Sequence, residues 1–145
     1  MVERKRICQM KVLIIIGLPC SGKTWLANQI SLGAIPIIDD SVCLGRDVLS
    51  QYTLDNLKNG YILTHPFLCE KETLQSEINW INETFNDVNV IIECVYFENN
   101  MQKCLRNLEY RMRNGDSRNT ELSIRRLAQE YNVPENIIAL PIWQP

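Results

Sequence analysis

The fold is decided near the start of the chain, where the run Lys11-Val-Leu-Ile-Ile-Ile16 leads directly into Gly17-Leu-Pro-Cys-Ser-Gly22-Lys23-Thr24. The first stretch is apolar after its lysine and mostly β-branched, a composition typical of a strand buried on both faces. The second stretch begins and nearly ends with glycine, which predicts a loop. A helical pattern then runs to about Ile30, and Gly33 is expected to end it. A strand, a glycine-rich loop and a helix in this order predict an α/β fold.

The loop matches the pattern G-x-x-x-x-G-K-[ST] at every constrained position. Its glycines allow the backbone to wrap so that N–H groups point at phosphate oxygens, and the helix that follows adds its positive N-terminal end. Lys23 is expected to reach the β and γ phosphates, and the Thr24 hydroxyl is a predicted Mg²⁺ ligand. A turn of coincidental composition is the alternative, but the strand before and the helix after favour an ATP-binding loop. The predicted ATP-binding residues are Gly17, Leu18, Pro19, Cys20, Ser21, Gly22, Lys23 and Thr24.

Further along the chain, apolar β-type runs alternate with amphipathic stretches. We predict strands over 35–38, 61–64, 88–97 and 137–143, the last at a sheet edge because of Pro141. Helices are expected over 41–58, 71–85, 100–113 and 120–131. This alternation, with the loop after the first strand, predicts a single domain, residues 1–145, with a three-layer α/β fold: about five parallel strands with helices on both faces.

Composition narrows the possible environments and partners. A formal net charge of −2 gives the 145-residue chain no overall basic field for nucleic acid. The apolar run from Val12 is far shorter than the roughly 20 residues that cross a bilayer, so we expect no membrane partner. Six scattered cysteines and one histidine lack the spacing of a zinc site or a disulfide framework, which favours a reducing, cytoplasmic location.

Two carboxylates follow the second predicted strand. The loop alone does not separate kinases from other nucleotide hydrolases, but the chain has no Asn-Lys-x-Asp guanine motif and no typical Walker B strand. In a kinase, a carboxylate at a neighbouring strand end can orient the acceptor and take its proton. We predict that Asp39 is this base, while Asp40 is expected to cap the next helix.

A cationic stretch over about residues 106–120 is the candidate lid. Arginines suit a lid that closes over a triphosphate and offsets the charge that develops on the transferred group. The Asn114-Gly115 turn would let it move, whereas Arg125 and Arg126 are expected on a solvated helix face. A solvated face is the competing interpretation for the whole stretch. The predicted lid residues are Arg106, Arg111, Arg113 and Arg118.

From residue 11 to about 131 the chain resembles the polynucleotide kinase branch of small P-loop kinases, which includes the phage 5′-hydroxyl kinases. The resemblance is carried by the loop followed by Trp25, and by Ile38-Asp39-Asp40, Gly60-Tyr-Ile-Leu-Thr64 and Cys104-Leu-Arg-Asn107. It implies the three-layer P-loop NTPase fold of the kinase type. It also implies that Asp39 is the general base and that Arg106, Arg111 and Arg113 belong to the lid. Two positions depart from the branch. Val42 stands where an arginine is expected, with Arg46 a turn further on, and His65 replaces a carboxylate.

The sequence therefore predicts an ATP-dependent phosphotransferase that uses Mg²⁺ and transfers the γ-phosphate of ATP. The resemblance implies the 5′-hydroxyl of a polynucleotide as acceptor. A nucleoside or nucleotide is the second candidate and a small metabolite the third. A non-catalytic module that binds ATP is the alternative outside enzymes.

Overall fold

The computed structural model describes residues 9–39, 59–116 and 118–145. The helix predicted over 41–58 lies outside the described residues, as do Asp40, Val42 and Arg46. The elements in chain order are β1 (Gln9–Ile16), α1 (Lys23–Ser31), β2 (Ile37–Asp39), β3 (Tyr61–Thr64), the short 3₁₀ helix η2 (Pro66–Cys69), α4 (Lys71–Thr84), β4 (Asn89–Tyr96), α5 (Met101–Arg113) and α6 (Glu121–Glu130).

The described strands form one parallel sheet with the order β2-β3-β1-β4. The first predicted strand, β1, is central: its Ile14 pairs with Leu63 of β3 on one side and with Cys94 of β4 on the other. Burial explains its composition, because Val12, Ile14, Ile15 and Ile16 are all fully buried. From Val12 to Ile16 the strand has neighbours on both edges and packed side chains on both faces, which leaves no polar position, whereas Gln9 and Lys11 at its start are exposed.

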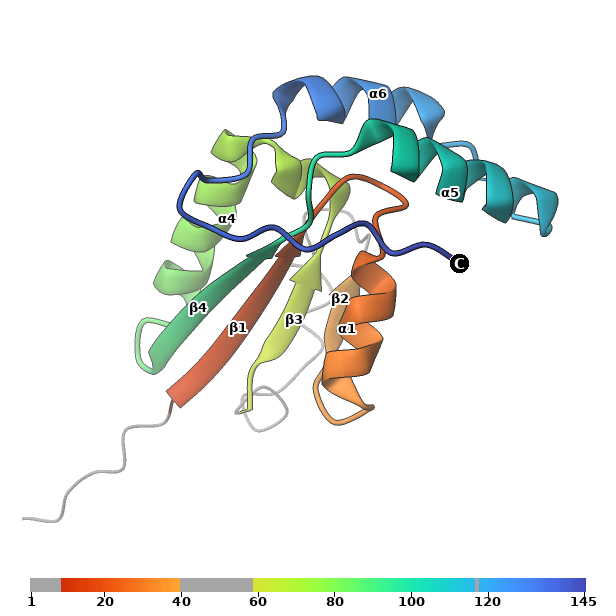
Figure 1. Ribbon diagram of the computed structural model, residues 1–145. Helices are drawn as coiled ribbons and strands as arrows, with labels where there is room; N and C mark the ends of the chain where they lie inside the picture. Colours follow the sequence, from red (N-terminus) through yellow and green to blue (C-terminus); the bar gives the residue numbers. More distant parts are fainter. Residues whose placement is uncertain (1–8, 40–58, 117) are drawn as a thin grey trace, which may run out of the picture.

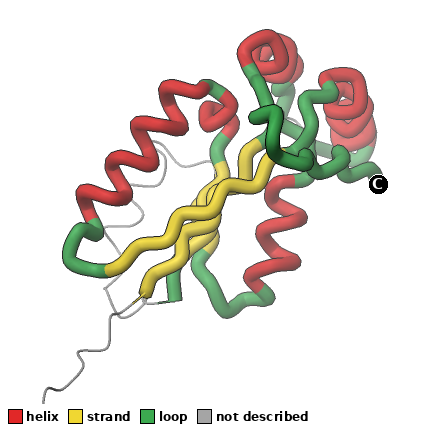
Figure 2. Tube along the Cα trace, turned by 60° about the vertical axis from the view of Figure 1, so that its left-hand side comes forward, coloured by secondary structure: helices red, strands yellow, loops and turns green. Residues whose placement is uncertain are grey.

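Helices cover both faces of the sheet, so the predicted three-layer α/β architecture is confirmed (Figures 1 and 2). Helix α1 packs against β1, β2 and β3 on one face, and α4 lies on the other. Helices α5 and α6 pack on each other beyond the carboxyl ends of the strands. This arrangement leaves the loop after β1 beneath the α5–α6 pair.

The predicted fifth strand over 137–143 is wrong in extent. Within the described residues, this segment makes a single parallel bridge, between Leu140 and Phe97. The amide of Leu140 donates to the carbonyl of Tyr96 at 2.8 Å, and the amide of Glu98 donates to the carbonyl of Leu140 at 2.8 Å. The next amide on that side, of Ile142, donates to the side-chain Oε1 of Glu98 at 3.3 Å, so the ladder does not continue. The segment, blue in Figure 1, then runs towards the start of α1, where Trp143 donates its amide to Ser21 O at 3.1 Å.

The topology places a ligand crevice at the carboxyl ends of β1 and β3. The chain leaves β1 through α1 towards β2, whereas it leaves β3 through α4 and crosses to β4 on the far side of β1. Ligands of open parallel sheets bind where neighbouring connections diverge in this way. No helix in the described part of the chain is long and apolar enough to cross a membrane.

Candidate functional site

Residues 17–24 wrap tightly between β1 and α1, and their glycines are needed for this. A Cβ atom on Gly17 would lie 2.6 Å from the Ser21 hydroxyl oxygen. Gly22 has φ +108°, and a Cβ there would lie 2.7 Å from Cβ of Trp143. Cys20 also adopts a left-handed conformation, with φ 66°. The Ser21 hydroxyl is buried with no hydrogen-bond partner among the described residues, as expected of a loop shaped to receive a polar ligand.

Lys23 crosses the loop from the first turn of α1. Its side chain is 7% exposed and its Nζ donates to the carbonyl of Leu18 at 2.8 Å. The amide of Ser21 donates to the same carbonyl. A buried ammonium held against the loop backbone puts a positive charge where the motif requires one for the β and γ phosphates.

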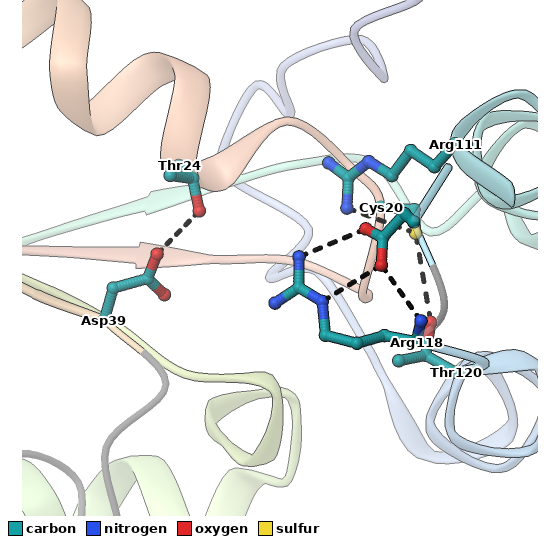
Figure 3. Close-up of polar contacts among 7 residues, drawn as sticks. Cys20, Thr24, Asp39, Arg111, Arg118 and Thr120 are labelled. Carbon is teal, nitrogen blue, oxygen red and sulfur yellow. Dashed lines mark hydrogen bonds and ion pairs between the residues drawn. The ribbon is translucent and has the colours of Figure 1, made fainter. Parts of the chain in front are cut away.

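Asp39 ends β2 and contacts the loop directly (Figure 3). The Thr24 hydroxyl donates to its Oδ2 at 2.7 Å, and the Thr64 hydroxyl donates to its Oδ1 at 2.6 Å. The sheet register creates the second contact, because Asp39 is the partner of Thr64 across β2 and β3. The predicted Mg²⁺ ligand and the predicted base therefore lie side by side, and one hydroxyl orients each oxygen of the carboxylate.

The pair formed by Thr24 and Asp39 fits a hard divalent cation, because hydroxyl and carboxylate oxygens are ligands that Mg²⁺ accepts. Within the described ranges, no group of three or more His, Cys, Asp or Glu side chains could hold a metal ion. Mg²⁺ is usually held by one or two protein oxygens together with phosphates and waters. The Thr24 and Asp39 oxygens are enough for that kind of site.

A cavity of about 630 Å³ opens above the loop, a volume in the range of small-molecule sites. The loop contributes one wall, Asp39 and the segment after β3 a second, and the lid segment the third. The lining residues are Pro19, Cys20, Gly22, Lys23, Thr24, Asp39, His65, Pro66, Phe67, Leu108, Arg111, Asp116, Arg118, Thr120 and Ser123.

Two of the four predicted lid arginines line this cavity. Arg111 donates through Nη1 to Sγ of Cys20 at 3.5 Å, so α5 contacts the tip of the loop. Arg118 pairs with Asp116, with Nη2 3.2 Å from Oδ2. Figure 3 shows both arginines near Cys20, apart from the pair formed by Thr24 and Asp39. Positive groups thus lie on the lid side of the cavity and the carboxylate of Asp39 on the sheet side.

The other two predicted lid arginines, Arg106 and Arg113, do not line the cavity. Both are exposed, and Arg113 forms an ion pair with Glu109 one turn earlier in α5. Arg125, expected on a solvated face, pairs with Glu121 at 3.0 Å. Lid roles for Arg106 and Arg113 remain predictions that would require α5 to move.

Asn107 and Trp143 hold the loop in place, a role that the sequence analysis did not predict for either residue. Asn107 is 4% exposed, and its Nδ2 donates to the carbonyls of Cys20 at 2.9 Å and Trp143 at 2.6 Å. The ring of Trp143 stacks on that of Trp25, with centroids 6.0 Å apart. One amide thus joins the loop, the lid helix and the C-terminal segment. The resemblance included Asn107 in the stretch Cys104-Leu-Arg-Asn107, but it gave no sign of these contacts.

His65 caps the segment after β3. Its Nδ1 accepts from the amide of Phe67 at 3.1 Å, and the two rings lie 5.0 Å apart. Phe67 is 45% exposed, and the guanidinium of Arg126 lies 5.6 Å from its ring centroid. The structure contains the cap and also places the side chain on the cavity wall.

Two buried cysteines lie close to Lys23. Burial raises the pKa of the Cys69 thiol from 9.0 to about 12, although Lys23 and a backbone hydrogen bond to Gly17 act in the opposite direction. Burial likewise raises the pKa of Cys104 from 9.0 to about 12, again against the charge of Lys23. These thiols stay neutral near pH 7 and act as small core side chains beneath the loop.

No family model matches the chain. The chain is similar to an uncharacterized protein of Acanthamoeba polyphaga mimivirus, with 28% identity over 130 residues. The match covers 85% of this chain and 87% of the relative, so the two are similar over most of their lengths. That relative has no assigned activity, and the case for a function rests on the geometry of the site.

Proposed function

We propose that this chain is a P-loop kinase that transfers the γ-phosphate of ATP to a hydroxyl acceptor. The observation that carries the proposal is the 2.7 Å hydrogen bond from Thr24 to Asp39. It joins Thr24, the last residue of the loop motif, to the carboxylate at the end of β2, and both residues line one cavity. A nucleotide-binding switch can also place a carboxylate beside the loop threonine to hold Mg²⁺. The resemblance to polynucleotide kinases favours a role for Asp39 as the base that accepts the proton of the acceptor.

In the proposed mechanism, the loop amides and Lys23 bind the β and γ phosphates. Mg²⁺, held by Thr24 with Asp39 close by, would neutralise charge on these phosphates. The acceptor oxygen forms a bond to the γ-phosphorus as the bond from that phosphorus to the β,γ-bridging oxygen breaks, and ADP leaves with the electron pair. Asp39 takes the proton of the acceptor hydroxyl. Arg111 and Arg118 offset the negative charge on the transferred group from the opposite wall.

The segment after β3 supports an acceptor that carries an aromatic base. Phe67 presents a half-exposed ring on the cavity wall that continues from Asp39, and stacking on such a ring suits bases of any sequence. This feature favours a nucleic-acid or nucleoside acceptor over a small sugar. With the resemblance to polynucleotide kinases, we propose the 5′-hydroxyl of a polynucleotide, with a nucleoside or nucleotide as the second candidate.

The test is a transfer assay with γ-labelled ATP and a panel of acceptors: 5′-hydroxyl oligonucleotides, nucleosides, nucleoside monophosphates and small sugars. We expect label in the oligonucleotides, and none with Lys23→Ala. Label in nucleosides or monophosphates alone would move the enzyme to nucleotide metabolism. ATP binding without transfer to any acceptor would favour the non-catalytic module.

Asp39→Asn tests the assignment of the base. Loss of a general base typically lowers the rate of the chemical step by roughly 10²- to 10⁴-fold. The amide keeps an oxygen that can accept from Thr64, so ATP binding should stay near that of the wild type. Turnover equal to that of the wild type would remove Asp39 from the mechanism while leaving the P-loop assignment intact.

A further inference from the structure

A carboxylate lies where an anion site would not be expected to have one. Asp116 lines the same cavity as Lys23, Arg111 and Arg118, and an acidic side chain there opposes the binding of phosphate. Its place is fixed by the backbone, because its amide donates to the carbonyl of Arg111 at 3.0 Å. The presence of a carboxylate in a cavity that is expected to bind phosphate therefore needs a specific explanation.

The contacts of Asp116 reproduce those of a bound phosphate. Nε of Arg118 donates to Oδ1 at 3.3 Å, and Nη2 donates to Oδ2 at 3.2 Å. Two parallel bonds from one guanidinium are the fork with which arginine binds carboxylates and phosphates alike. The backbone amide of Arg118 adds a third bond to Oδ1 at 2.9 Å. Asp116 therefore occupies the face of Arg118 that a phosphate would need.

The pair is fully charged at neutral pH yet open to water. The hydrogen bond from the Arg118 side chain is the main cause of a lowered pKa at Asp116, with the backbone bond and the charges of Arg118 and Arg111 acting in the same direction. The Arg118 side chain is 74% exposed. Solvent-exposed ion pairs are weak, so a phosphate with more charge can replace the carboxylate.

We propose that Asp116 holds the place of the transferred phosphate: it binds Arg118 in the nucleotide-free protein, and the γ-phosphate of ATP displaces it. This inference rests on the proposed function. It makes Asp116 a specificity-determining residue, because only a ligand whose phosphate reaches Arg118 competes with the carboxylate. This competition weakens the binding of ATP but not that of ADP, so Asp116 reduces the difference in affinity between the two nucleotides. After transfer of the γ-phosphate, Arg118 pairs with Asp116 again.

The competing explanation is that Asp116 only shapes the turn after α5. Asp116→Asn separates the two, since the amide oxygen can still accept from the backbone N–H of Arg118 while the charge is lost. Glu109→Gln is the matched control. It also removes one negative charge from an exposed ion pair with an arginine. Glu109 and Arg113 lie in α5, close in the chain to Asp116, but they do not line the cavity.

The experiment is calorimetric titration of wild type, Asp116→Asn and Glu109→Gln with Mg-ATP and with Mg-ADP. We expect Asp116→Asn to bind ATP roughly two- to fivefold more tightly, the range that release of an exposed ion pair can supply, with ADP unchanged. Glu109→Gln should bind both like the wild type. In an Arg118→Ala background the effect of Asp116→Asn should vanish, because the two residues act as one unit.

Each other outcome decides against the proposal. If Asp116→Asn binds ATP as tightly as the wild type or more weakly, the inference is overturned. The kinase proposal still stands in that case, provided that Lys23→Ala abolishes transfer of the label. The proposal also fails if Asp116→Asn binds ATP and ADP more tightly by the same factor, or if Glu109→Gln binds ATP more tightly by as much. Either result would mean that the loss of one negative charge anywhere on the protein explains the effect. If neither wild type nor Asp116→Asn binds Mg-ATP, the inference and the proposed function fail together.

Discussion

The loop after β1 and the lid segment form two walls of one cavity, but they are built in opposite ways. Lys23 and Ser21 of the loop are buried, and the loop carbonyls of Leu18 and Cys20 accept side-chain donors. Arg118 of the lid is exposed and pairs with an acid two residues away in the chain. One wall is held by the core, whereas the other is held by local contacts that water can replace.

This difference indicates how binding energy should divide between the walls. A preorganised, water-excluded donor contributes more to binding than an exposed one, because it pays no reorganisation when the ligand arrives. The loop should therefore supply most of the affinity for ATP. The lid should contribute later, through groups that must first exchange their own partners.

The largest expected effect comes from the buried wall. Lys23→Met keeps the aliphatic stem but removes the ammonium, and loss of charged hydrogen bonds should weaken ATP binding roughly 100-fold. Arg111→Ala on the lid should cost roughly tenfold or less, since the guanidinium is exposed. Lys103→Ala, which breaks an ion pair with Glu98 outside the cavity lining, is the matched control. A lid effect as large as that of Lys23 would break the comparison; calorimetric titration measures all three.

Two glycines with positive φ give a second contrast, in stability. Gly22→Ala forces a Cβ to within 2.7 Å of Cβ of Trp143 at φ +108°, whereas Gly115 at φ +95° has nothing within 4 Å of that position. We expect Gly22→Ala to lower the free energy of unfolding by roughly 3 kcal/mol and Gly115→Ala by about 1 kcal/mol. Melting temperatures should fall by roughly 6–12 °C and 2–4 °C respectively. Equal shifts would mean that the lid turn is as tightly packed as the loop.

The same contrast explains what could be predicted from the sequence. The strand, loop and helix from β1 to α1 were predicted because burial on both faces and the glycine positions leave local marks in composition. The contact of Thr64 with Asp39 was missed, although both residues were singled out as strand ends, because it depends on the sheet register. Asn107 was not predicted as a tether because its partner Cys20 is 87 positions away.

The error over 137–143 has the same origin. The apolar run there favoured a strand, but pairing stops after Leu140, and Trp143 bonds instead to Ser21 and Asn107. The spacing of apolar residues and the composition indicate which secondary structure a segment favours by itself. They do not show that a neighbouring loop offers better partners for its backbone than the sheet edge does.

Asn107 tests how far the loop depends on its tether. Asn107→Ala leaves the carbonyls of Cys20 and Trp143 without their side-chain donor in a buried setting, so we expect a loss of roughly 2 kcal/mol in the free energy of unfolding. ATP binding should weaken several-fold in parallel as the loop loosens. Asn114→Ala is the control: its Nδ2 donates to the carbonyl of Tyr110 at an exposed position on the lid side, and water can replace that bond. Urea unfolding separates the two, and a cost for Asn114 equal to that for Asn107 would contradict the assignment.

The smallest expected effect is a dependence of stability on alkaline pH, to which the buried thiols beneath the loop contribute. Burial raises the pKa of Cys69 and of Cys104 from 9.0 to about 12, so the folded chain retains protons that the unfolded chain loses. Where the unfolded state binds fewer protons, the free energy of unfolding falls as pH rises. The contribution of these protonated thiols to the free energy of unfolding is fully present below pH 9 and is lost between about pH 9 and 12.

Melting temperatures measured from pH 7 to 11 should therefore fall less steeply above pH 9 for Cys69→Ala than for the wild type, even though the variant starts from a lower value. Cys94→Ala makes a useful comparison, because burial raises the pKa of Cys94 as well, but Cys94 lies on β4 and Lys23 does not act on its pKa. If Cys69→Ala kept the slope of the wild type, the thiol would have to ionise at the same pH in the folded and unfolded chain, and the loop would not rest on a water-excluded base.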